Sequence, residues 1–535
     1  MAGRRQISNA SGGAPPTKGI NDTDPLANMD PSFCVSMLNI FPDNAALSLR
    51  HGFQEYATGL GASVTRVMDY NAPDGTTEMF AVTAAGIYDI TGGTNPLYPA
   101  APTLVHALTN GRVSTTQITN TGGAYLIAAN GVDAAAFYNG TAWAPFVADA
   151  TPVNPGEIDG LAPTSILGPV VHKGRLWVVE KDSMSAWYFP TDAIAGTLTE
   201  FPLSGVFRTG GKLVELSTWS LDTGAGMDDM LVFRSSTGEI AVYSGNDPDV
   251  ATEWMLVAVY YVSSPVGNVS SVDLGGDVVM LTRAGLIPLS KVVQGAAQES
   301  LFESALSRNI SKTLNRLVNN RSASEQSEWE LHNLPTLQML MVLIPEGSTT
   351  TAVQYVMNTT TGAWTSYNLP ATCGCLTDGL FYFGTTDGRV CKYTSDSTTL
   401  KDDVKLDGTG GSVVSGEFLT AFTYLGDATK LKHFKLVRPT IQSLTSPQVS
   451  VTLNVDFDTA DGALYAAPTV GIGQTDNWDA GIWDTAVWSN TNSVFRPWAS
   501  VMGIGFSAAL RVKLTNISTT TVASLEVVYE TGGIV

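Results

Sequence analysis

The chain has 535 residues and a formal net charge of −20, with 44% hydrophobic and only 15% charged residues. This composition excludes a disordered chain, and it argues against a protein that grips nucleic acid through Lys and Arg. One hydrophobic core rarely grows beyond about 300 residues, so we expect several domains or a repeat.

The N-terminal sequence "MAGRRQISNASGGAPPTKG" carries basic residues, but no apolar run follows them. It therefore does not have the pattern of a signal peptide. No window of the chain has the apolar length of a membrane helix. We expect residues 1–45 to form an extended arm of a protein that is made in the cytoplasm and does not insert into membranes.

Pairs of short strands, separated by Gly or Asp turns, recur about every fifty residues between residues 46 and 400. Examples are "EMFAVTAAGIYDITGG", "GRLWVVEKDSMSAWYFP" and "LFYFGTTDGRVCKYT". Each unit is too short to bury its own faces, and a period of about 40–50 residues fits propeller blades. We predict an all-β fold with a β-propeller of six to seven blades over 46–400. "HGFQEYATGL", from His51, is expected to supply the outer strand that closes the ring.

One predicted blade ends in "VYSGNDPDVATEW", Val242–Trp254. Asp247 and Asp249 are two residues apart, as calcium ligands or paired catalytic acids can be. They also follow a hairpin, where Gly245 can adopt positive φ and the following proline stiffens a turn. We favour the turn over a metal site, and we expect Trp254 to anchor the segment to a neighbouring blade.

Clear helical periodicity occurs once, in Gln298–Asn320, and predicts one helix inserted at about 296–321. Its apolar positions are Phe302, Leu306, Ile310, Leu314 and Leu317. Arg308, Lys312 and Arg316 form a basic stripe, each four residues apart. The stripe could face DNA or an acidic partner, but a solvated face matched to the helix dipole is the favoured interpretation.

The last part of the chain has a different pattern. Residues 401–416 are polar and rich in Gly, which predicts a linker. Residues 417–535 alternate in "SVTLNVDFDT", "AALRVKLTN" and "ASLEVVYET", which predicts a C-terminal β-sandwich-like domain. This domain contains the tryptophans Trp478, Trp483, Trp488 and Trp498. Such clusters can bind carbohydrate, but they more often pack a core or a subunit interface.

The sequence offers only weak candidates for metal-binding or catalytic motifs. "CGC" at Cys373–Cys375 and Cys391 offer three thiolates, but no fourth ligand completes a zinc set. Asp456–Asp461 places three aspartates near a glycine, where calcium is the alternative to the favoured surface turn. The sequence contains no P-loop and neither the GxSxG nor the HExxH pattern. We expect no enzyme activity, no metal and no cofactor.

Four stretches, in order, resemble the tail nozzle or tail tubular protein B-like family of short-tailed bacteriophages. Related proteins close the head and are called packaged-DNA-stabilisation factors. The first stretch is "GINDTDPLANMDPSFCVSMLNIFPDNAALSLRHGFQEYATG", Gly19–Gly59, and the second is Val242–Ser290. The third is the predicted helix that follows, and the fourth is Arg496–Gly533, with "RPWASVMGIGFSAALRVKL" and "LEVVYETGG".

The resemblance implies a structural virion protein of the podovirus tail, with a propeller body. It implies a homo-oligomeric ring, commonly a hexamer, below the portal and adaptor proteins, with tail fibres or spikes docked outside. Genomic double-stranded DNA would be retained and ejected through the ring with non-specific contacts. The alternative hypothesis is a carbohydrate-binding or depolymerising propeller used in host recognition, and a third is a generic scaffold for protein partners.

Overall fold

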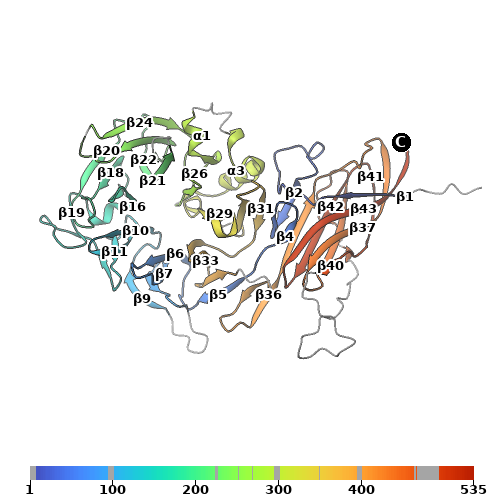
Figure 1. The fold of residues 1–535 in the computed structure, drawn as a ribbon, viewed down its shortest axis with the longest axis horizontal. Coiled ribbons are helices and arrows are strands. Elements are labelled where there is room, and N and C mark those ends of the chain that lie inside the picture. Colours follow the sequence, from blue (N-terminus) through green and yellow to red (C-terminus); the bar gives the residue numbers. More distant parts are fainter. Residues whose placement is uncertain are drawn as a thin grey trace, which may run out of the picture.

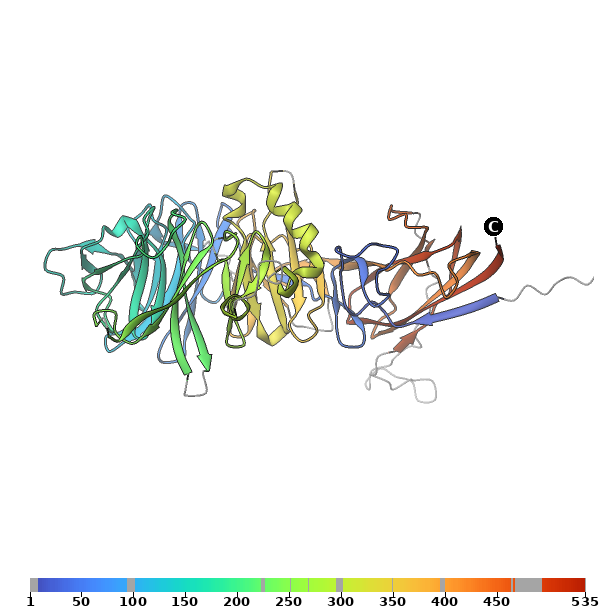
Figure 2. The same cartoon turned by 90° about the horizontal axis from the view of Figure 1, so that it is seen from above.

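The computed structural model describes residues 8–93, 102–222, 227–250, 252–267, 269–294, 302–348, 350–394, 400–462, 465–466 and 493–534. The described chain is built mainly of β-strands, as the alternating sequence predicts. Figures 1 and 2 show an elongated molecule with two parts. A ring of small sheets forms one part, and a layered β-structure that contains the last strands forms the other.

Five separate sheets stand around the ring as propeller blades (Figure 1). The first two are β6 (Val64–Asn71), β7 (Thr77–Thr83), β8 (Gly86–Asp89) and β9 (Thr103–Ala107), then β10 (Ser114–Asn120), β11 (Gly123–Ala129), β12 (Ala136–Tyr138) and β13 (Trp143–Pro145). The next two are β16 (Ile166–His172), β17 (Arg175–Glu180), β18 (Ser185–Tyr188) and β20 (Thr199–Pro202), then β21 (Leu213–Asp222), β22 (Met227–Ser235), β23 (Glu239–Gly245) and β24 (Trp254–Tyr261). The fifth has three strands, β25 (Ser271–Leu274), β26 (Asp277–Thr282) and β27 (Gly285–Pro288). Five is fewer than the six to seven predicted, because the remaining strands of the ring are hydrogen-bonded into one larger sheet.

Central strands of the blades are apolar because neighbouring blades cover both of their faces. In β11, Leu126 packs in a cluster with Phe80 of the first blade. The next residue, Ile127, points the other way and packs with Leu176 of the third blade. A small parallel sheet of β14 (Val147–Ala148), β15 (Glu157–Asp159) and β19 (Gly196–Thr197) adds to the second of these clusters.

The predicted single helix is wrong in its extent. Within the described residues, the segment contains a helical turn at 302–304, a 3₁₀ turn η2 (Arg308–Ile310) and α3 (Ser311–Asn319). The helix is interrupted because the chain between these pieces bonds to β27: the Leu306 N–H donates to the Leu286 carbonyl, and the Leu286 N–H donates to the Ser307 hydroxyl. Two short helices flank the segment, α1 (Leu289–Val293) and α4 (Ala323–Gln326).

The larger sheet has fourteen strands and runs from the ring into the layered part. Its ring strands are β28 (Glu330–Leu334), β29 (Met339–Ile344), β30 (Val353–Asn358), β31 (Trp364–Tyr367), β32 (Cys373–Thr377), β33 (Leu380–Gly384), β34 (Val390–Tyr393) and β5 (Phe53–Ala57). β5 pairs with β34, which confirms the expected strand from the segment after His51. β2 (Cys34–Leu38), β35 (Lys401–Val404) and β36 (Gly410–Thr420) connect the two halves of this sheet.

The linker expected at 401–416 is instead paired strand. β35 pairs with β36, and one residue of β35 also bridges to β5. The second half of β36 pairs with β2 and with β42 (Ala508–Asn516) of the layered part. These strands could not be predicted from their polar, Gly-rich sequence. Each is stabilised by pairing with distant parts of the chain, and not by an alternation of apolar and polar residues within the strand.

The layered part is a β-sandwich made from both ends of the described chain. One layer contains β1 (Ser8–Gly13), β3 (Ile40–Pro42), β4 (Leu47–Leu49), β37 (Lys430–Ser443), β40 (Ser493–Phe495), β41 (Ala499–Gly505) and β43 (Thr520–Ile534). The other contains β2, β36, β42, β38 (Gln448–Val455) and β39 (Tyr465–Ala466). Phe418 of one layer and Phe434 of the other are fully buried in a shared core. The arm expected at 1–45 is, where described, strand and loop: β1 and β3 lie in the sandwich, whereas the loop around Gly19 and Asp22 contacts β31 and the start of α3.

Candidate functional site

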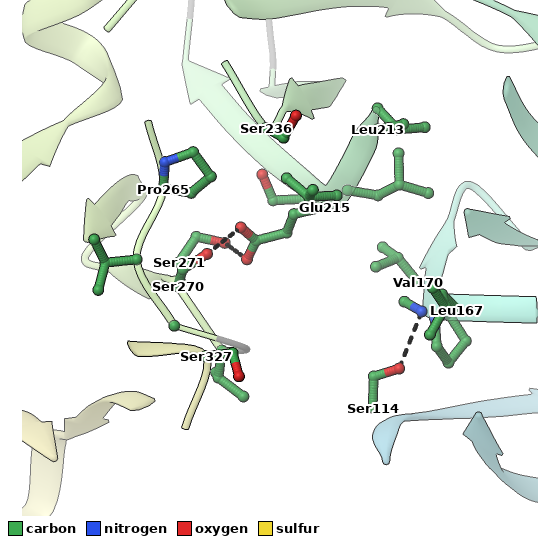
Figure 3. Close-up of a pocket in the computed structure, with 18 of the residues that line it drawn as sticks. Ser114, Leu167, Val170, Leu213, Glu215, Ser236, Pro265, Ser270, Ser271 and Ser327 are labelled. Atoms are coloured by element: carbon green, nitrogen blue, oxygen red, sulfur yellow. Dashed lines mark hydrogen bonds between the residues drawn. The ribbon is translucent and has the colours of Figure 1, made fainter. Parts of the chain in front are cut away.

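The ring encloses a central cavity of about 870 Å³. It is lined by the first strands of the blades, with Ser114 from β10, Leu167 and Val170 from β16, and Leu213 and Glu215 from β21 (Figure 3). These strands form the wall because each blade turns its first strand toward the axis of the ring. The cavity therefore has a mixed wall of hydroxyl, aliphatic and charged side chains.

Glu215 is the most strongly bound carboxylate of this wall. It accepts hydrogen bonds from the hydroxyls of Ser270 at 2.7 Å and Ser271 at 2.6 Å, as Figure 3 shows. It also forms an ion pair with Arg234, whose side chain is only 3% exposed. A carboxylate held by three partners serves structure, because its charge is already neutralised and its oxygens are occupied.

A second cavity of about 350 Å³ lies between β6, β10, β28 and β32. Glu330 is buried beside it and binds Arg66 at 3.0 Å and His332 at 2.8 Å. The Gly374 N–H donates to the same carboxylate at 2.8 Å. Burial raises the pKa of Glu330, but Arg66, His332 and this N–H outweigh it, so the pKa lies below its ordinary value. This group stays ionised and ties β6, β28 and β32 together.

Among the carboxylates that line the larger cavity, Asp273 is the one whose charge is least compensated by neighbouring groups. It lies on β25 at the wall of the larger cavity, and burial raises its pKa above the ordinary value. The other lining acids of that cavity are Glu215, described above, and Asp182, which binds Lys212 at 2.9 Å.

Within the described residues no group of three His, Cys, Asp or Glu side chains is arranged to hold a metal ion. Of the described residues that line the two cavities, none is Trp, Tyr or Phe.

The basic stripe lies on η2 and α3, with Arg308, Lys312 and Arg316 all exposed. Lys312 donates from its Nζ to the Thr23 carbonyl at 2.8 Å, so it contacts the N-terminal segment of the same chain. Asp22 accepts from the backbone N–H groups of Lys312 and Thr313 and thereby caps the start of α3. The structure thus gives Lys312 a structural contact and leaves the stripe at the surface.

The turn between β23 and β24 joins two blades. Arg175 of β17 binds Asp247 at 2.8 Å and Asp249 at 3.4 Å. The Tyr188 hydroxyl donates to Asp249 at 2.5 Å, and Lys173 donates to the Gly245 carbonyl at 2.9 Å. Both aspartates are therefore occupied by the neighbouring blade, and the turn is an inter-blade contact.

Trp254 begins β24 and extends this contact into the core. Its ring stacks on Trp177 of the neighbouring blade, with centroids 5.7 Å apart and planes 15° apart. It also stacks on Tyr243 of its own blade, with centroids 5.9 Å apart. Trp498 is 39% exposed and lies under the Arg438 guanidinium, 4.4 Å from the ring centroid. Trp478, Trp483 and Trp488 lie outside the described residues.

The candidate calcium loop at Asp456–Asp461 is held by protein groups. The Asp456 carboxylate accepts from the N–H groups of Phe506 at 2.8 Å and Ser507 at 3.0 Å. Asp458 accepts from the Ala460 N–H, and Asp461 binds Arg511 at 2.8 Å. The three aspartates therefore point to three different partners. Such a loop is a hydrogen-bonded turn.

Of the cysteines in the candidate zinc set, Cys373 and Cys375 lie on β32 and Cys391 lies on β34. Burial raises the pKa of each thiol to about 12. The three thiols are therefore protonated at neutral pH.

Sequence reasoning missed a buried polar clamp between ring and sandwich, which is centred on Arg50. The Arg50 side chain is fully buried and binds both carboxylate oxygens of Asp402, at 2.7 and 2.6 Å. It also donates to the side-chain oxygens of Asn39 at 2.8 Å and Asn368 at 3.2 Å. One side chain thus links β35, the end of β31 and the segment between β2 and β3.

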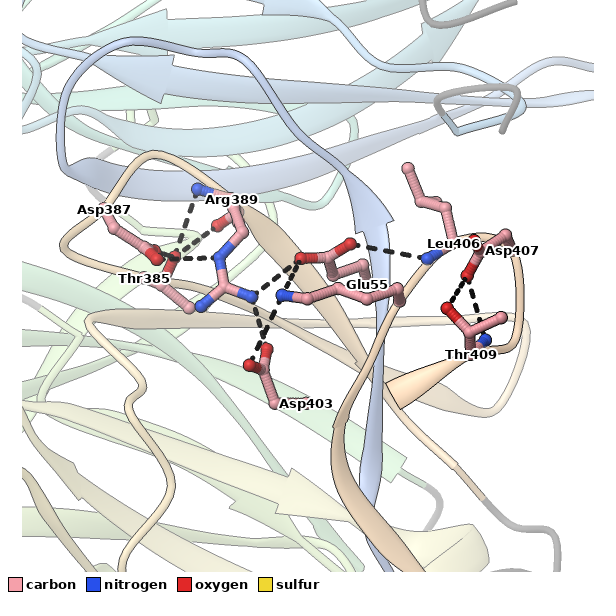
Figure 4. Close-up of polar contacts among 9 residues, drawn as sticks. Glu55, Thr385, Asp387, Arg389, Asp403, Leu406, Asp407 and Thr409 are labelled. Atoms are coloured by element: carbon pink, nitrogen blue, oxygen red, sulfur yellow. Dashed lines mark hydrogen bonds and ion pairs between the residues drawn. The ribbon is translucent and has the colours of Figure 1, made fainter. Parts of the chain in front are cut away.

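A second polar cluster surrounds Glu55 of β5 (Figure 4). Glu55 of β5 accepts from Arg389 and Lys405, both at 2.9 Å. Arg389 also forms ion pairs with Asp403 and, at 2.8 Å, with Asp387. Because Asp402 and Asp403 are adjacent in β35, their carboxylates fasten this strand to the ring at two points. The paired aspartates in "KDDVKL" were the only sequence signal for this clamp.

Comparison with known proteins gives no functional identity. No known protein family and no curated protein matches the chain. Among solved structures, a computationally designed protein named Ika8 is 10% identical, with a TM-score of 0.34 over 64% of this chain and 99% of that protein. Raptor from Chaetomium thermophilum is also 10% identical, with a TM-score of 0.36 over 65% of this chain and 30% of that protein. Both likenesses are too low to bear on function.

Proposed function

We propose that the chain is a structural virion protein, a ring-forming nozzle or head-to-tail tube component of a short-tailed phage. The resemblance of the stretches around Gly19–Gly59, Val242–Ser290 and Arg496–Gly533 supports this assignment. The structural observation that supports this proposed function is the clamp between ring and sandwich. Domains joined by a short polar linker move relative to each other by default, whereas a tube wall that retains pressurised DNA needs one rigid body.

We also propose that the ring has seven blades, which is the upper end of the predicted range of six to seven. β28–β31 and the group β32–β34 with β5 are four-stranded antiparallel units like the separate blades. Their first strands, β28 and β32, line the second cavity beside β6 and β10. This placement supports a ring of seven units closed by β5.

In this proposal DNA passes through the channel of the assembled ring of subunits, and not through the cavities inside one propeller. The cavities inside one propeller are small, about 870 and 350 Å³. The net charge of −20 suits a tube wall along which a duplex slides, because phosphates find few cations to bind. Replacing acids that face the subunit ring's channel with neutral amides should therefore slow genome ejection, and unchanged ejection would contradict this role of the charge.

The alternative function, a carbohydrate-binding or depolymerising propeller, has less support. Glycan sites usually offer an aromatic platform, and the described lining of both cavities has none. Glu215, the cavity acid with most contacts, is occupied by Arg234, Ser270 and Ser271.

Electron microscopy of the purified full chain tests the proposal. A closed ring of subunits with an axial hole is the expected result. A stable monomer at high concentration that binds or cleaves polysaccharide would overturn it in favour of the alternative.

A further inference from the structure

Most blades protect the outer edge of their sheet, where an unpaired strand would otherwise bind other strands. β13 has three residues and ends in Pro145, and β20 has four and ends in Pro202. β27 is covered by the segment at Leu306, β31 pairs with β2, and β5 pairs with β35. Among the described residues, β24 and β9 are the two outer strands with neither a covering segment nor a proline.

β24 is an unusual edge. Its eight residues, "WMLVAVYY", contain no charge, no proline and no glycine. The exposed fractions of its side chains are 62% for Met255, 43% for Leu256, 49% for Val257, 38% for Val259 and 53% for Tyr261. A long, uncharged and apolar edge strand is a template for pairing with a further strand.

The structure also holds β24 ready for a partner. Arg175 and Lys173 fasten the turn before the strand to the neighbouring blade. Trp254, at the start of the strand, stacks on both Trp177 and Tyr243. Because the strand is already ordered, a partner loses little free energy to ordering it.

β9 is the second open edge. Its sequence is "TLVHA", and Leu104 and Val105 are 47% and 37% exposed. It belongs to the first blade and β24 to the fourth, and Figure 1 shows the two strands on different sides of the ring. A contact from one to the other between copies would be head-to-tail, and head-to-tail contacts close into rings when the rotation allows.

We propose that β24 of one copy pairs with β9 of a second copy of this chain. The occupant is a second copy because both strands lack Asp, Glu, Lys and Arg. Molecules that each carry a net charge of −20 repel each other, and an uncharged seam lets them approach without adding like-charge contacts. The inference rests on the proposed ring and assigns its lateral contact.

The test uses two single variants of the full chain, Met255→Lys on β24 and Leu104→Lys on β9. A lysine on an edge strand opposes pairing while leaving the exposed site compatible with folding. Met502→Lys, at a methionine of the sandwich that is 74% exposed, is the matched control. The masses of all four proteins are measured by light scattering after size-exclusion chromatography, with far-ultraviolet circular dichroism to verify folding.

We expect a ring mass for the unaltered chain and for Met502→Lys, and a monomer mass for each edge variant. Mixing the two edge variants should give a dimer and no ring, because one copy keeps an intact β9 and the other an intact β24. Rings that persist in both edge variants would overturn the strand pairing while leaving the nozzle proposal standing. Folded edge variants that stay monomeric when mixed would also overturn it. An unaltered chain that is monomeric at all concentrations would overturn both.

Discussion

At the scale of single residues, the side chains with most influence on the fold are buried groups with several partners. Arg50 and Trp254 are the two clearest cases, one polar and one aromatic. Neither lies in a cavity wall, and each connects strands that are distant in sequence. Substitutions of these two residues are therefore expected to change the stability of the protein.

Arg50→Met should lower the free energy of unfolding by about 3 kcal/mol, because it leaves Asp402 and two asparagine oxygens without their buried partner. Lys18→Met is the control, since Lys18 and Asp30 form an exposed pair with 54% and 50% of each side chain accessible. That change should cost less than about 1 kcal/mol. Denaturant titration followed by circular dichroism measures both, and equal losses would contradict the clamp.

Trp254→Ala should lower the free energy of unfolding by about 3–5 kcal/mol, because it leaves a cavity beside Trp177 and Tyr243. Trp254→Phe keeps most of the apolar contact and should cost less. Trp498→Ala, at a ring that is 39% exposed, should cost clearly less than Trp254→Ala. Thermal unfolding followed by Trp fluorescence and circular dichroism ranks the three, and an equal effect at both tryptophans would refute the inter-blade role of Trp254.

At the scale of elements, the strands that sequence predicts well are those with local signals. β38, β42 and β43 follow the alternation of their own residues, and the hairpin from β33 to β34 has its glycine at Gly388, where φ is 77°. The outer strand β5 was also predicted. These elements are specified by side chains within a few residues of each other.

Elements that depend on distant partners could not be predicted. β35 and β36 lie in a polar, Gly-rich stretch and become strands because β5, β2 and β42 pair with them. The predicted helix breaks at Leu306 because β27 takes its N–H. The clamp was missed for the same reason, since Arg50 and Asp402 are brought together only by the closed ring.

The ion pairs of β35 should make the junction sensitive to acid. Burial raises the pKa of Asp403, but Arg389 and Lys405 outweigh it, so the folded pKa lies below the ordinary value. Its contribution to stability is therefore complete above the ordinary pKa of about 4 and is lost as pH falls through the lower folded value.

Asp403→Asn should consequently lower the thermal midpoint at neutral pH but not at a pH below the folded pKa of Asp403. Differential scanning calorimetry across this range measures the difference between variant and parent. A difference that stays constant down to the lowest pH would show that the Asp403 charge does not contribute.

At the scale of the whole molecule, ring and sandwich should behave as one rigid body. The double variant Glu55→Gln with Asp402→Asn removes one charge from each of the two polar clusters while keeping side-chain size. We expect both parts to stay folded and to move relative to each other, because domain motion is the default without a firm interface. Small-angle scattering should show a broader distribution of interatomic distances.

The control for that experiment is Asp407→Asn with Asp427→Asn. These two carboxylates bond within their own turns, to Thr409 and to Thr429 and Lys430. The control should scatter like the unaltered protein. A rigid double variant at the clamp would refute the role given to the junction.

The sandwich contains strands from both ends of the described chain, and this has a consequence for biosynthesis. In the register of β1 and β43, Ser8 lies opposite Glu530. At a translation rate of about 5–20 residues per second, the first strand leaves the ribosome roughly 30 to 100 seconds before its partner. During that time the blades can assemble one after another, while the edges of β3 and β4 remain open to chaperones or to neighbouring chains. Synthesis of β43, and not completion of the propeller, therefore sets the moment at which these strands can complete the sandwich.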